Sequence, residues 1–450
     1  MRKVLAHSVF VLPLFFLINC SSGSQDDPQI TEEEQQEGQN GNQNEEPTIE
    51  ISSIINTSDQ GKLIDAFFFD LKGWPDRTNT VEKATAYFVN DGMNGIRISI
   101  YGDIQRPAHP GPGVVVESQY EPMLTSITTA LSVKPDLKIF ASKKLRSTNS
   151  FPDWVKDNTG IIPKQYAIML ADFIEFMNGK GITIDYLGID NEFVYNEGNI
   201  TPEKYHETIF ELRVLASTRG FDLPILVGYE DFGPNKRNWV QILMESGWGN
   251  DMDIYGTHYY PQFRPKDKLI TDLNSIDNRP FWATEPHWDK VKTENPDVFL
   301  NAEAAMVTLW DQTDLGMTGF MWWNYNLEDE LRTRLMQAAS TPLLYSRPIS
   351  MTDIDGEDLT ELGKLQSRAF IKANQVNVYF VNMSDTSYTD YGIALSDNQK
   401  IADNVVYTQW RETTTIDGQQ LSGTVTSDNT AVQVNLPKRS ITKIDLTIQD

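Results

Sequence analysis

The sequence predicts a parallel (β/α)8 barrel followed by a small antiparallel β-sandwich. Eight short apolar runs rich in β-forming residues lie between residues 64 and 326, and longer amphipathic stretches separate them. Strands that alternate with helical segments in this way favour a parallel sheet covered by helices. After about residue 345 apolar and polar residues alternate between turn-forming residues, which is typical of antiparallel strands.

The strand-like runs follow one another at uneven spacing. They span residues 64–70, 95–101, 137–142, 186–192, 224–230, 253–260, 281–288 and 317–326. A clear helical segment precedes the fourth run: in "PKQYAIMLADFIEFMNGKG" the residues Tyr166, Met169 and Phe173 recur at helical spacing, and Gly179 ends the pattern. No Gly-rich phosphate-binding turn follows the first run, so a doubly wound nucleotide-binding sheet is disfavoured.

Polar and aromatic side chains accumulate at the C-terminal ends of these runs. They are Asp70, Tyr101, Asn191, Glu192, Glu230, His258, Tyr259, Glu285 and Asn324. The C-terminal ends of barrel strands share one face, and that face carries the active site in enzymes with this fold. The accumulation therefore supports the barrel and indicates where its chemistry lies.

The second domain is predicted from four alternating segments. They are residues 374–384, 403–412, 430–437 and 441–448. We place the barrel at residues 49–345 and the sandwich at residues 346–450. Residues 49–58 also alternate, and we expect them to add a strand to the sandwich.

The N-terminus predicts export. Residues 1–20 combine Arg2 and Lys3 with an apolar run too short to span a bilayer comfortably, and they end at Cys20, the chain's one cysteine. This segment resembles a bacterial lipoprotein signal, in which Cys20 becomes the lipidated first residue; an ordinary secretory signal is the alternative. Residues 21–48 hold eight acidic residues and no basic one, so we expect a disordered tether. The stretch "SQDDP" near its start is similar to export signals of surface lipoproteins in Bacteroidetes-type bacteria, and we therefore expect the protein on the outer face of the cell envelope.

The net charge and the composition limit the classes of molecule that the protein can bind. The formal net charge of −25 repels nucleic acid and mildly disfavours strongly anionic polysaccharides, although a local basic pocket would override this mean field. Aromatic residues make up 11% of the chain and include ten Trp. Flat aromatic faces are the surfaces on which sugar rings pack, so a neutral glycan is the favoured partner. We expect a monomer that contacts the membrane through Cys20 alone.

Two glutamates are candidates for glycosidic bond cleavage. Such cleavage uses a pair of carboxylates, which lie about 5 Å apart in retaining enzymes. Glu192 ends the fourth run and Glu285 lies near the end of the seventh, so both would face one barrel mouth. A single Glu at a strand end is usually a solvated cap or an ion-pair partner. The two glutamates together, with Asn191, Arg97 and His258, indicate a catalytic site.

At these residues the chain resembles the large clan of retaining glycoside hydrolases with (β/α)8 barrels, in which an Asn-Glu pair ends strand four and a Glu ends strand seven. The resemblance implies that Glu192 is the acid/base, Asn191 a donor to the sugar 2-hydroxyl and Glu285 the nucleophile. It also implies that Arg97 keeps the nucleophile ionised; a purely structural ion pair is the alternative for this Arg. Within the clan the chain is most similar to glycoside hydrolase family 30, through "IFASKKLRSTNSFPDWVK" and through a C-terminal sandwich joined by an N-terminal strand.

Other residues are expected to bind the substrate. The resemblance implies that His258, Tyr259 and either Trp322 or Trp323 line the site. Further candidates for walls of the sugar site are Trp74, Trp288, Tyr195 and Tyr260. Trp322 and Trp323 are adjacent on one strand and point to opposite sides, so only one of them can form the floor of the sugar site. Xylan, a β-glucan, a β-galactan and a red-algal galactan such as agar or porphyran are all compatible substrates.

Other chemistries are less well supported. The five His form no His-x-x-x-His pair, so we expect no catalytic metal and no cofactor. No Gly-x-Ser-x-Gly elbow of a serine hydrolase occurs. The alternative to an enzyme is a surface lipoprotein that binds glycans without cleaving them, but the presence of both carboxylates argues against it.

Overall fold

The computed structural model describes most of the chain beyond the N-terminal segments. The described ranges are 49–102, 106–144, 150–192, 200–231, 239–260, 278–287, 298–323, 342–359, 365–411, 418–426 and 428–449. The expected signal with Cys20, the expected tether, Tyr195, Trp288 and Asn324 lie outside these ranges.

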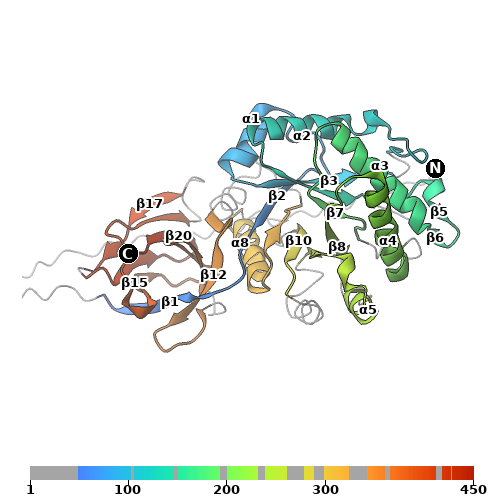
Figure 1. The fold of residues 1–450 in the computed structure, drawn as a ribbon. Coiled ribbons are helices and arrows are strands. Elements are labelled where there is room, and N and C mark those ends of the chain that lie inside the picture. Colours follow the sequence, from blue (N-terminus) through green and yellow to red (C-terminus); the bar gives the residue numbers. More distant parts are fainter. Residues whose placement is uncertain are drawn as a thin grey trace, which may run out of the picture. The chain divides into compact units, whose positions relative to one another are not determined.

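Eight parallel strands close into a barrel (Figure 1). They are β2 (Ala66–Asp70), β3 (Gly95–Ile100), β4 (Lys138–Lys143), β7 (Tyr186–Gly188), β8 (Ile225–Asp231), β9 (Ile254–Tyr259), β10 (Phe281–Pro286) and β11 (Gly319–Phe320). Nearly every residue of each strand falls within one of the eight predicted runs. The predicted fold class, a (β/α)8 barrel with a C-terminal β domain, is confirmed.

Helices lie outside the barrel strands (Figure 1). They are α1 (Val81–Thr85), which continues into the π-helical turn η1 (Ala86–Asn90), α2 (Glu121–Val133), α3 (Pro163–Gly179), α4 (Pro202–Arg219), α5 (Trp239–Glu245) and α8 (Val298–Asp314). In α3 the predicted face of Tyr166, Met169 and Phe173 is buried. Helix α4 begins where the Thr201 side chain accepts from the Lys204 amide, and it ends at Gly220 with a φ of 75°. None of the described helices is long and apolar enough to cross a membrane.

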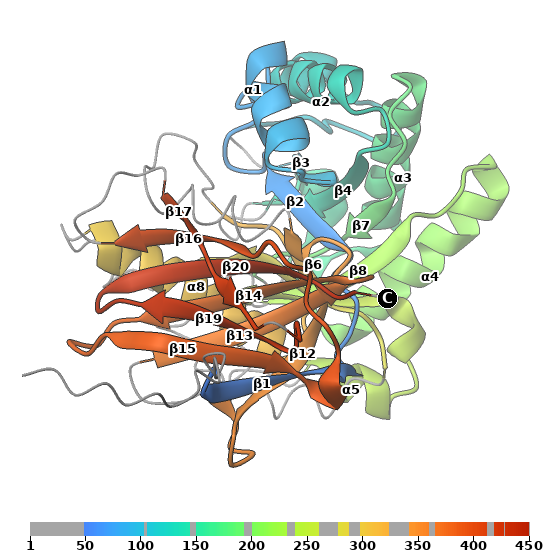
Figure 2. The same ribbon diagram turned by 90° about the vertical axis from the view of Figure 1, so that its left-hand side faces the viewer.

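The C-terminal domain is one ten-stranded sheet in which almost all neighbours are antiparallel (Figure 2). In spatial order its strands are β17 (Gln419–Ser422), β16 (Val406–Arg411), β20 (Ser440–Thr447), β14 (Gln375–Asn382), β13 (Leu365–Lys372), β12 (Arg347–Asp353), β1 (Ile51–Gln60), β15 (Tyr388–Leu395), β19 (Ala431–Leu436) and β18 (Thr424–Val425). An apolar core that includes Ile55, Val378 and Ile393 joins its strands.

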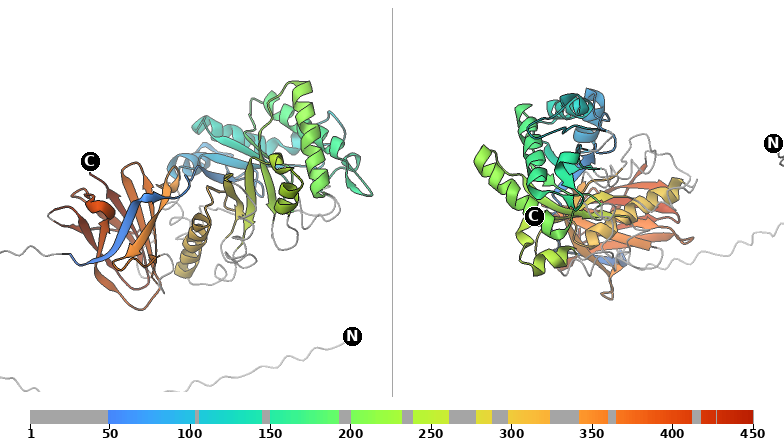
Figure 3. Two further views of the ribbon diagram at one scale, coloured as in Figure 1. Left: turned by 60° about the horizontal axis from the view of Figure 1, so that its bottom comes forward. Right: turned by 90° about the vertical axis from the view of Figure 1, so that its right-hand side faces the viewer.

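The N-terminal strand β1 lies inside this sheet, as expected for the residues that precede the barrel. It pairs with β12 in antiparallel orientation and with β15 in parallel orientation. Figure 3 shows β1 in blue against the later strands of the sheet. The smaller elements are the hairpin β5 (Lys156–Asp157) and β6 (Gly160–Ile161) and the short helices η2 (Glu117–Gln119), η3 (Asp153–Val155), η5 (Gly249–Asp251) and η7 (Ser396–Asn398).

Candidate active site

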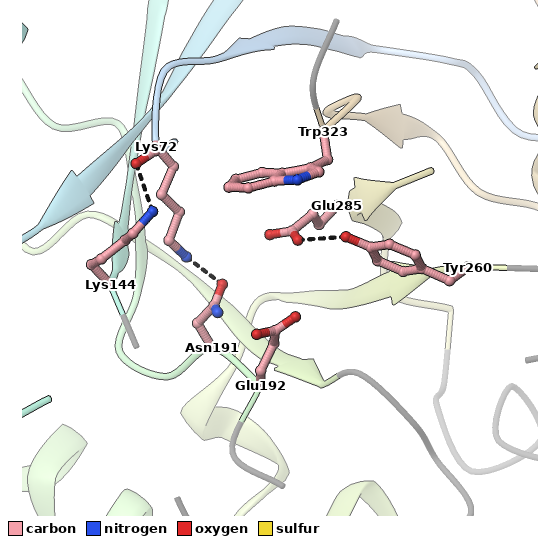
Figure 4. Close-up of a pocket in the computed structure, with 7 residues that line it drawn as sticks. All are labelled: Lys72, Lys144, Asn191, Glu192, Tyr260, Glu285 and Trp323. Atoms are coloured by element: carbon pink, nitrogen blue, oxygen red, sulfur yellow. Dashed lines mark hydrogen bonds between the residues drawn. The ribbon is translucent and has the colours of Figure 1, made fainter. Parts of the chain in front are cut away.

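Two carboxylates from opposite sides of the barrel meet at its mouth (Figure 4). Glu192 follows β7, the fourth barrel strand, and Glu285 lies near the end of β10, the seventh. Their nearest carboxylate oxygens lie within 4.8 Å of each other. That separation is close to the spacing of about 5 Å in retaining glycosidases and leaves no room for a water molecule between the carboxyl groups.

Irregular strand register turns two carboxylates into the barrel. In β10, Trp282 packs in the interior apolar cluster and Glu285 contacts Arg97, although strict alternation would place residues three apart on opposite sides. The pairing of β10 with β9 shifts register between Ala283 and Glu285. A bulge of this kind re-aims the side chains that follow it. The pairing of β8 with β9 shifts in the same way just before its end, where Glu230 turns inward.

The backbone holds Glu192 in an uncommon conformation. Its φ is 54°, in the left-handed region that non-glycine residues seldom adopt. The amide N–H of Glu192 donates to the carbonyl oxygen of Glu230 at 2.8 Å, which fixes this conformation. Glu230 itself has a φ of 53°. Backbone strain of this kind is found preferentially at functional sites.

Arg97 is the centre of the buried charge network. Its guanidinium is fully buried and donates to Asp70 at 2.6 Å, to Glu230 at 2.6 Å and to Glu285 at 3.0 Å. Burial by itself would lower the pKa of Arg97, but the charges of Glu230, Asp70 and Glu285 outweigh it and raise that pKa well above its usual value. The cation therefore stays charged and cannot reach a substrate.

Glu285 is held in its ionised form. Burial raises the pKa of its carboxyl group, but the positive groups of His258, Arg97 and Lys72 and a hydrogen bond from Tyr260 outweigh burial and lower the pKa to about 2. The Tyr260 hydroxyl donates to Oε1 at 2.7 Å, and Arg97 donates to Oε2. A carboxylate with both oxygens directed in this way is positioned as a nucleophile.

His258 lies between the two glutamates. Its Nδ1 is 3.4 Å from Glu192 Oε1, and its Nε2 is 3.6 Å from Glu285 Oε2. The ring is fully buried, so it positions the carboxylates and does not contact a ligand. Glu192 is the more exposed partner, with 22% of its side chain accessible, which suits a group that exchanges protons with solvent.

Asn191 is oriented by two cations. Arg97 donates to its Oδ1 at 2.9 Å, and the Lys72 ammonium donates to the same oxygen. Because both donors take the oxygen, the amide NH2 is the end left to face a ligand. Lys72 also donates to the Ser142 hydroxyl at 2.7 Å. Burial and the nearby Arg97 charge lower the pKa of Lys72 to about 7, against the opposing charges of Glu230 and Glu285.

A pocket of about 210 Å³ opens beside the two carboxylates. It is lined by Lys72, Lys144, Asn191, Glu192, Tyr260, Glu285 and Trp323. The Trp323 ring forms one wall above Glu285 (Figure 4). Trp74 packs against Trp323 with ring centroids 4.9 Å apart, so it supports that wall from outside the pocket. Gly73 permits the close approach, because a Cβ at this position would lie 2.8 Å from the Trp323 ring.

Four of the expected substrate contacts are absent from the pocket lining, namely Tyr259, Trp322, His258 and Trp74. Tyr259 is buried and its hydroxyl donates to Asp311 of α8 at 3.2 Å, because alternation along β9 points it away from the barrel interior. Its neighbour Tyr260 takes the expected place. Trp322 is buried in the apolar core, so Trp323 is the member of that pair that lines the pocket. Arg97 and His258 lie beneath the pocket and position its carboxylates. Trp288 falls outside the described residues.

Sequence reasoning missed the two lysines of the pocket. Lys72 lies two residues after Asp70 at the end of β2, and Lys144 directly follows β4. Both follow strand ends at the active face of the barrel, and that position was the signal that could have identified them. Glu230 was noted only as a strand-end residue, although it is a central acceptor for Arg97 and for Ser142, whose hydroxyl donates to it at 2.7 Å.

Within the described ranges, Glu192, His258 and Glu285 are also the one group of side chains close enough to hold a metal ion. Arg97 already lies 3.0 Å from Glu285, and Lys72 adds a second positive charge nearby. These cations neutralise the carboxylates and would repel a divalent ion. The donor set therefore fits a carboxylate pair better than a metal centre.

Comparisons with known proteins agree with this architecture. No protein-family model and no curated protein matches the chain. Among solved structures, an endoxylanase of glycoside hydrolase family 30 from Clostridium papyrosolvens has a TM-score of 0.66 at 15% identity, over 88% of this chain and 100% of that one. The catalytic domain of the family 30 xylanase C from Talaromyces cellulolyticus has a TM-score of 0.67 at 17% identity, over 88% and 99%. An endo-β-1,6-glucanase has a TM-score of 0.64 at 13% identity, over 89% and 94%.

The barrel with facing carboxylates thus has the fold of a glycoside hydrolase. More narrowly, the fold is that of family 30, and the predicted resemblance to that family is confirmed at the level of structure over nearly the whole described chain. At these identities the likeness concerns the fold, so the chemistry has to be argued from the site itself.

Proposed function

We propose that this protein is a retaining β-glycoside hydrolase that cleaves a polysaccharide by double displacement. One observation carries the proposal: Glu285, whose pKa is lowered to about 2, lies within 4.8 Å of the more exposed Glu192 at the active face of a barrel. One carboxylate is thus held ionised while the other is open to protons, which is the division of labour that the reaction needs.

In the first step Glu285 attacks the anomeric carbon of the sugar in the pocket. Glu192 donates its proton to the glycosidic oxygen, the bond between that oxygen and the anomeric carbon breaks, and an ester between the sugar and Glu285 forms. The Asn191 amide faces the ring and would donate to the 2-hydroxyl. Tyr260 and Arg97, which hold the Glu285 oxygens, would limit its movement during attack.

In the second step the same groups act in reverse. The Glu192 carboxylate takes a proton from water, the water oxygen attacks the anomeric carbon, and Glu285 leaves as a carboxylate. The two inversions together retain the β configuration. Arg97, with His258 and Lys72 nearby, favours the departing negative charge on Glu285.

The two glutamates can be distinguished by chemical rescue. We expect Glu285→Ala and Glu192→Ala each to lower turnover about 10³-fold or more, since each removes a group used in bond cleavage. With an activated aryl glycoside, azide should enter the space of the lost carboxylate. Glu192→Ala would then yield a β-glycosyl azide and Glu285→Ala an α-glycosyl azide, because azide attacks from opposite faces. Full activity in either variant, or the reverse stereochemistry, would contradict the assigned roles.

The substrate is proposed to be a plant or algal polysaccharide of the xylan, β-glucan, β-galactan, agar or porphyran type. The similar structures include two xylanases and an endo-β-1,6-glucanase, which supports a β-linked polymer as the substrate. The aromatic wall formed by Trp323 suits a sugar ring. A panel of soluble polymers, compared between the native chain and Glu285→Ala, would identify the polymer by product release that the variant lacks.

We further propose that the protein is anchored by a lipid on Cys20 at the cell surface. The apolar run before this single cysteine and the acidic residues after it support the proposal. Expression in a Bacteroidetes-type host should give a membrane-bound, palmitate-labelled protein that external protease can reach. Cys20→Ala should abolish the label; labelling that persists in this variant would overturn the anchor.

A further inference from the structure

The pocket has a basic wall, and the cleavage mechanism uses it only through the charge of Lys72, which helps keep Glu285 ionised. Lys72 and Lys144 stand on the side of the pocket across from Tyr260, with Trp323 above and Asn191 below (Figure 4). A neutral sugar hydroxyl needs a hydrogen-bond donor, which an amide or hydroxyl supplies without the cost of burying a charge. Two ammonium groups beside one small pocket therefore require another explanation.

The Lys72 ammonium donates two hydrogen bonds to neighbouring side chains. The Lys72 side chain is buried, and the acceptors are the Ser142 hydroxyl and Asn191 Oδ1, both neutral groups. An ammonium has three N–H donors, so one is left for a ligand in the pocket. Within the part of the chain that the structure describes, no carboxylate lies at ion-pair distance from this ammonium. Burial and the Arg97 charge lower the pKa of Lys72 to about 7, so a nearby anion would favour its charged form.

Lys144 is the second and less buried cation of the wall. Its ammonium donates to the backbone carbonyl of Lys72 at 2.8 Å and lies 5.4 Å from the centroid of the Trp323 ring. This half-buried cation is therefore placed beside the surface on which a sugar would pack. Figure 4 shows Glu285 beneath Trp323 and the two lysines to one side of that ring. A sugar packed on Trp323 with its anomeric carbon at Glu285 would therefore direct another edge to the two lysines.

We propose that the sugar bound in this pocket carries an anionic substituent, a carboxylate or a sulfate half-ester, which pairs with Lys72 and Lys144. This inference rests on the proposed function, because it takes the ligand of the site to be a glycan. The formal net charge of −25 repels anionic ligands on average, but at this pocket the substituent would meet the two lysines. Charge-assisted hydrogen bonds to two ammonium groups would make the substituent a determinant of specificity.

Matched pairs of polymers test the proposal. One pair is glucuronoxylan and its carboxyl-reduced form, and the other is a sulfated galactan and its desulfated form. Binding to the full chain is measured by calorimetry in a Glu192→Gln background, which keeps the polymer uncut. We expect one anionic polymer to bind about tenfold or more tightly than its neutral partner, and that pair identifies the substituent as carboxylate or sulfate. Equal binding within both pairs, or no binding to either anionic polymer, overturns the proposal.

Substitutions of Lys144 test whether the lysines cause the preference for the anionic polymer. Lys144→Met should remove most of the tenfold preference, Lys144→Arg should keep it, and Lys83→Met, at an exposed position of α1, should leave it unchanged as a control for net charge. Lys144→Gln is the second neutral variant if Lys144→Met does not fold. A preference that persists in both neutral variants overturns the proposal.

The two proposals can fail separately. If the native chain cuts a neutral polymer and binds its anionic relative no better, the anionic ligand is wrong and hydrolysis stands. If an anionic polymer binds through Lys144 but the native chain releases no product from it, the basic site stands and hydrolysis is wrong.

Discussion

The barrel interior has two halves built from the same strands, and they differ in almost every physical respect. The lower half is an apolar cluster that includes Phe68, Phe140 and Trp282, with the rings of Phe68 and Trp282 5.7 Å apart in an edge-on arrangement. The upper half is a network of buried charges centred on Arg97. On β2 the two halves are two residues apart, since Phe68 belongs to the lower half and Asp70 to the upper.

The difference shows that one half of the barrel interior stabilises the fold and the other half serves catalysis. Close-packed aromatic rings stabilise the fold by removing apolar surface from water. Buried ion pairs contribute little net stability, because desolvation offsets their attraction, yet removing one member leaves the others uncompensated. The upper half is therefore expected to be costly to alter and to set the properties of Glu285, whereas the lower half is expected to affect folding alone.

The largest effect is expected from Arg97→Met. It removes the cation that contacts Asp70, Glu230 and Glu285, so it should lower the free energy of unfolding by about 3–5 kcal/mol. It should also raise the pKa of Glu285 and reduce kcat about 10³-fold or more. Denaturant unfolding and kinetics measure the two effects. Arg97→Lys, which keeps the charge without the planar fork, should lie between the native chain and Arg97→Met. Native kcat in Arg97→Met would show that the upper half does not control the nucleophile.

We expect Phe68→Ala to lower the free energy of unfolding by a comparable amount and to leave kcat nearly unchanged. The ring is buried against Trp282 and Tyr186, so its removal should cost about 3–5 kcal/mol of unfolding free energy. At temperatures where the variant is folded, kcat should stay within about threefold of the native value, because no charged group moves. Phe68→Leu is the conservative control and should cost less. A large fall in kcat with intact folding would mean that the two halves are coupled.

The smallest expected effect is a change of stability with pH. The folded-state pKa of Glu285 is about 2, below its ordinary value of 4.5, so its ionisation stabilises the folded state above about pH 4.5. That contribution, about 3 kcal/mol, is lost as the pH falls through 4.5 toward 2. The difference in unfolding free energy between the native chain and Glu285→Gln should therefore shrink as the pH falls from about 6 to about 2. Carboxyl groups remote from Glu285 titrate alike in both proteins and cancel, whereas Asp70, whose pKa the Glu285 charge raises, contributes to the difference. A difference that is independent of pH would show that Glu285 is not stabilised as an anion.

Much of the site was predictable because its functional residues lie at the C-terminal ends of the barrel strands. The apolar runs predict the eight barrel strands, and the residues at their ends predict the mouth, so Glu192 and Glu285 could be chosen from 63 acidic residues. Alternation states that Trp322 and Trp323 point to opposite sides, but it does not state which of them points inward.

What the sequence by itself determined is the order of strands and helices and the pair of carboxylates at the barrel mouth. These follow from local periodicity and from the rule that parallel strands end at one face. Only the tertiary structure decided that Tyr260 and not Tyr259 holds Glu285, and that Lys72 meets Asn191 inside the pocket. The physical reason is that side-chain direction at a strand end depends on register shifts such as those in β8 and β10. These shifts arise from pairing between strands far apart in the chain.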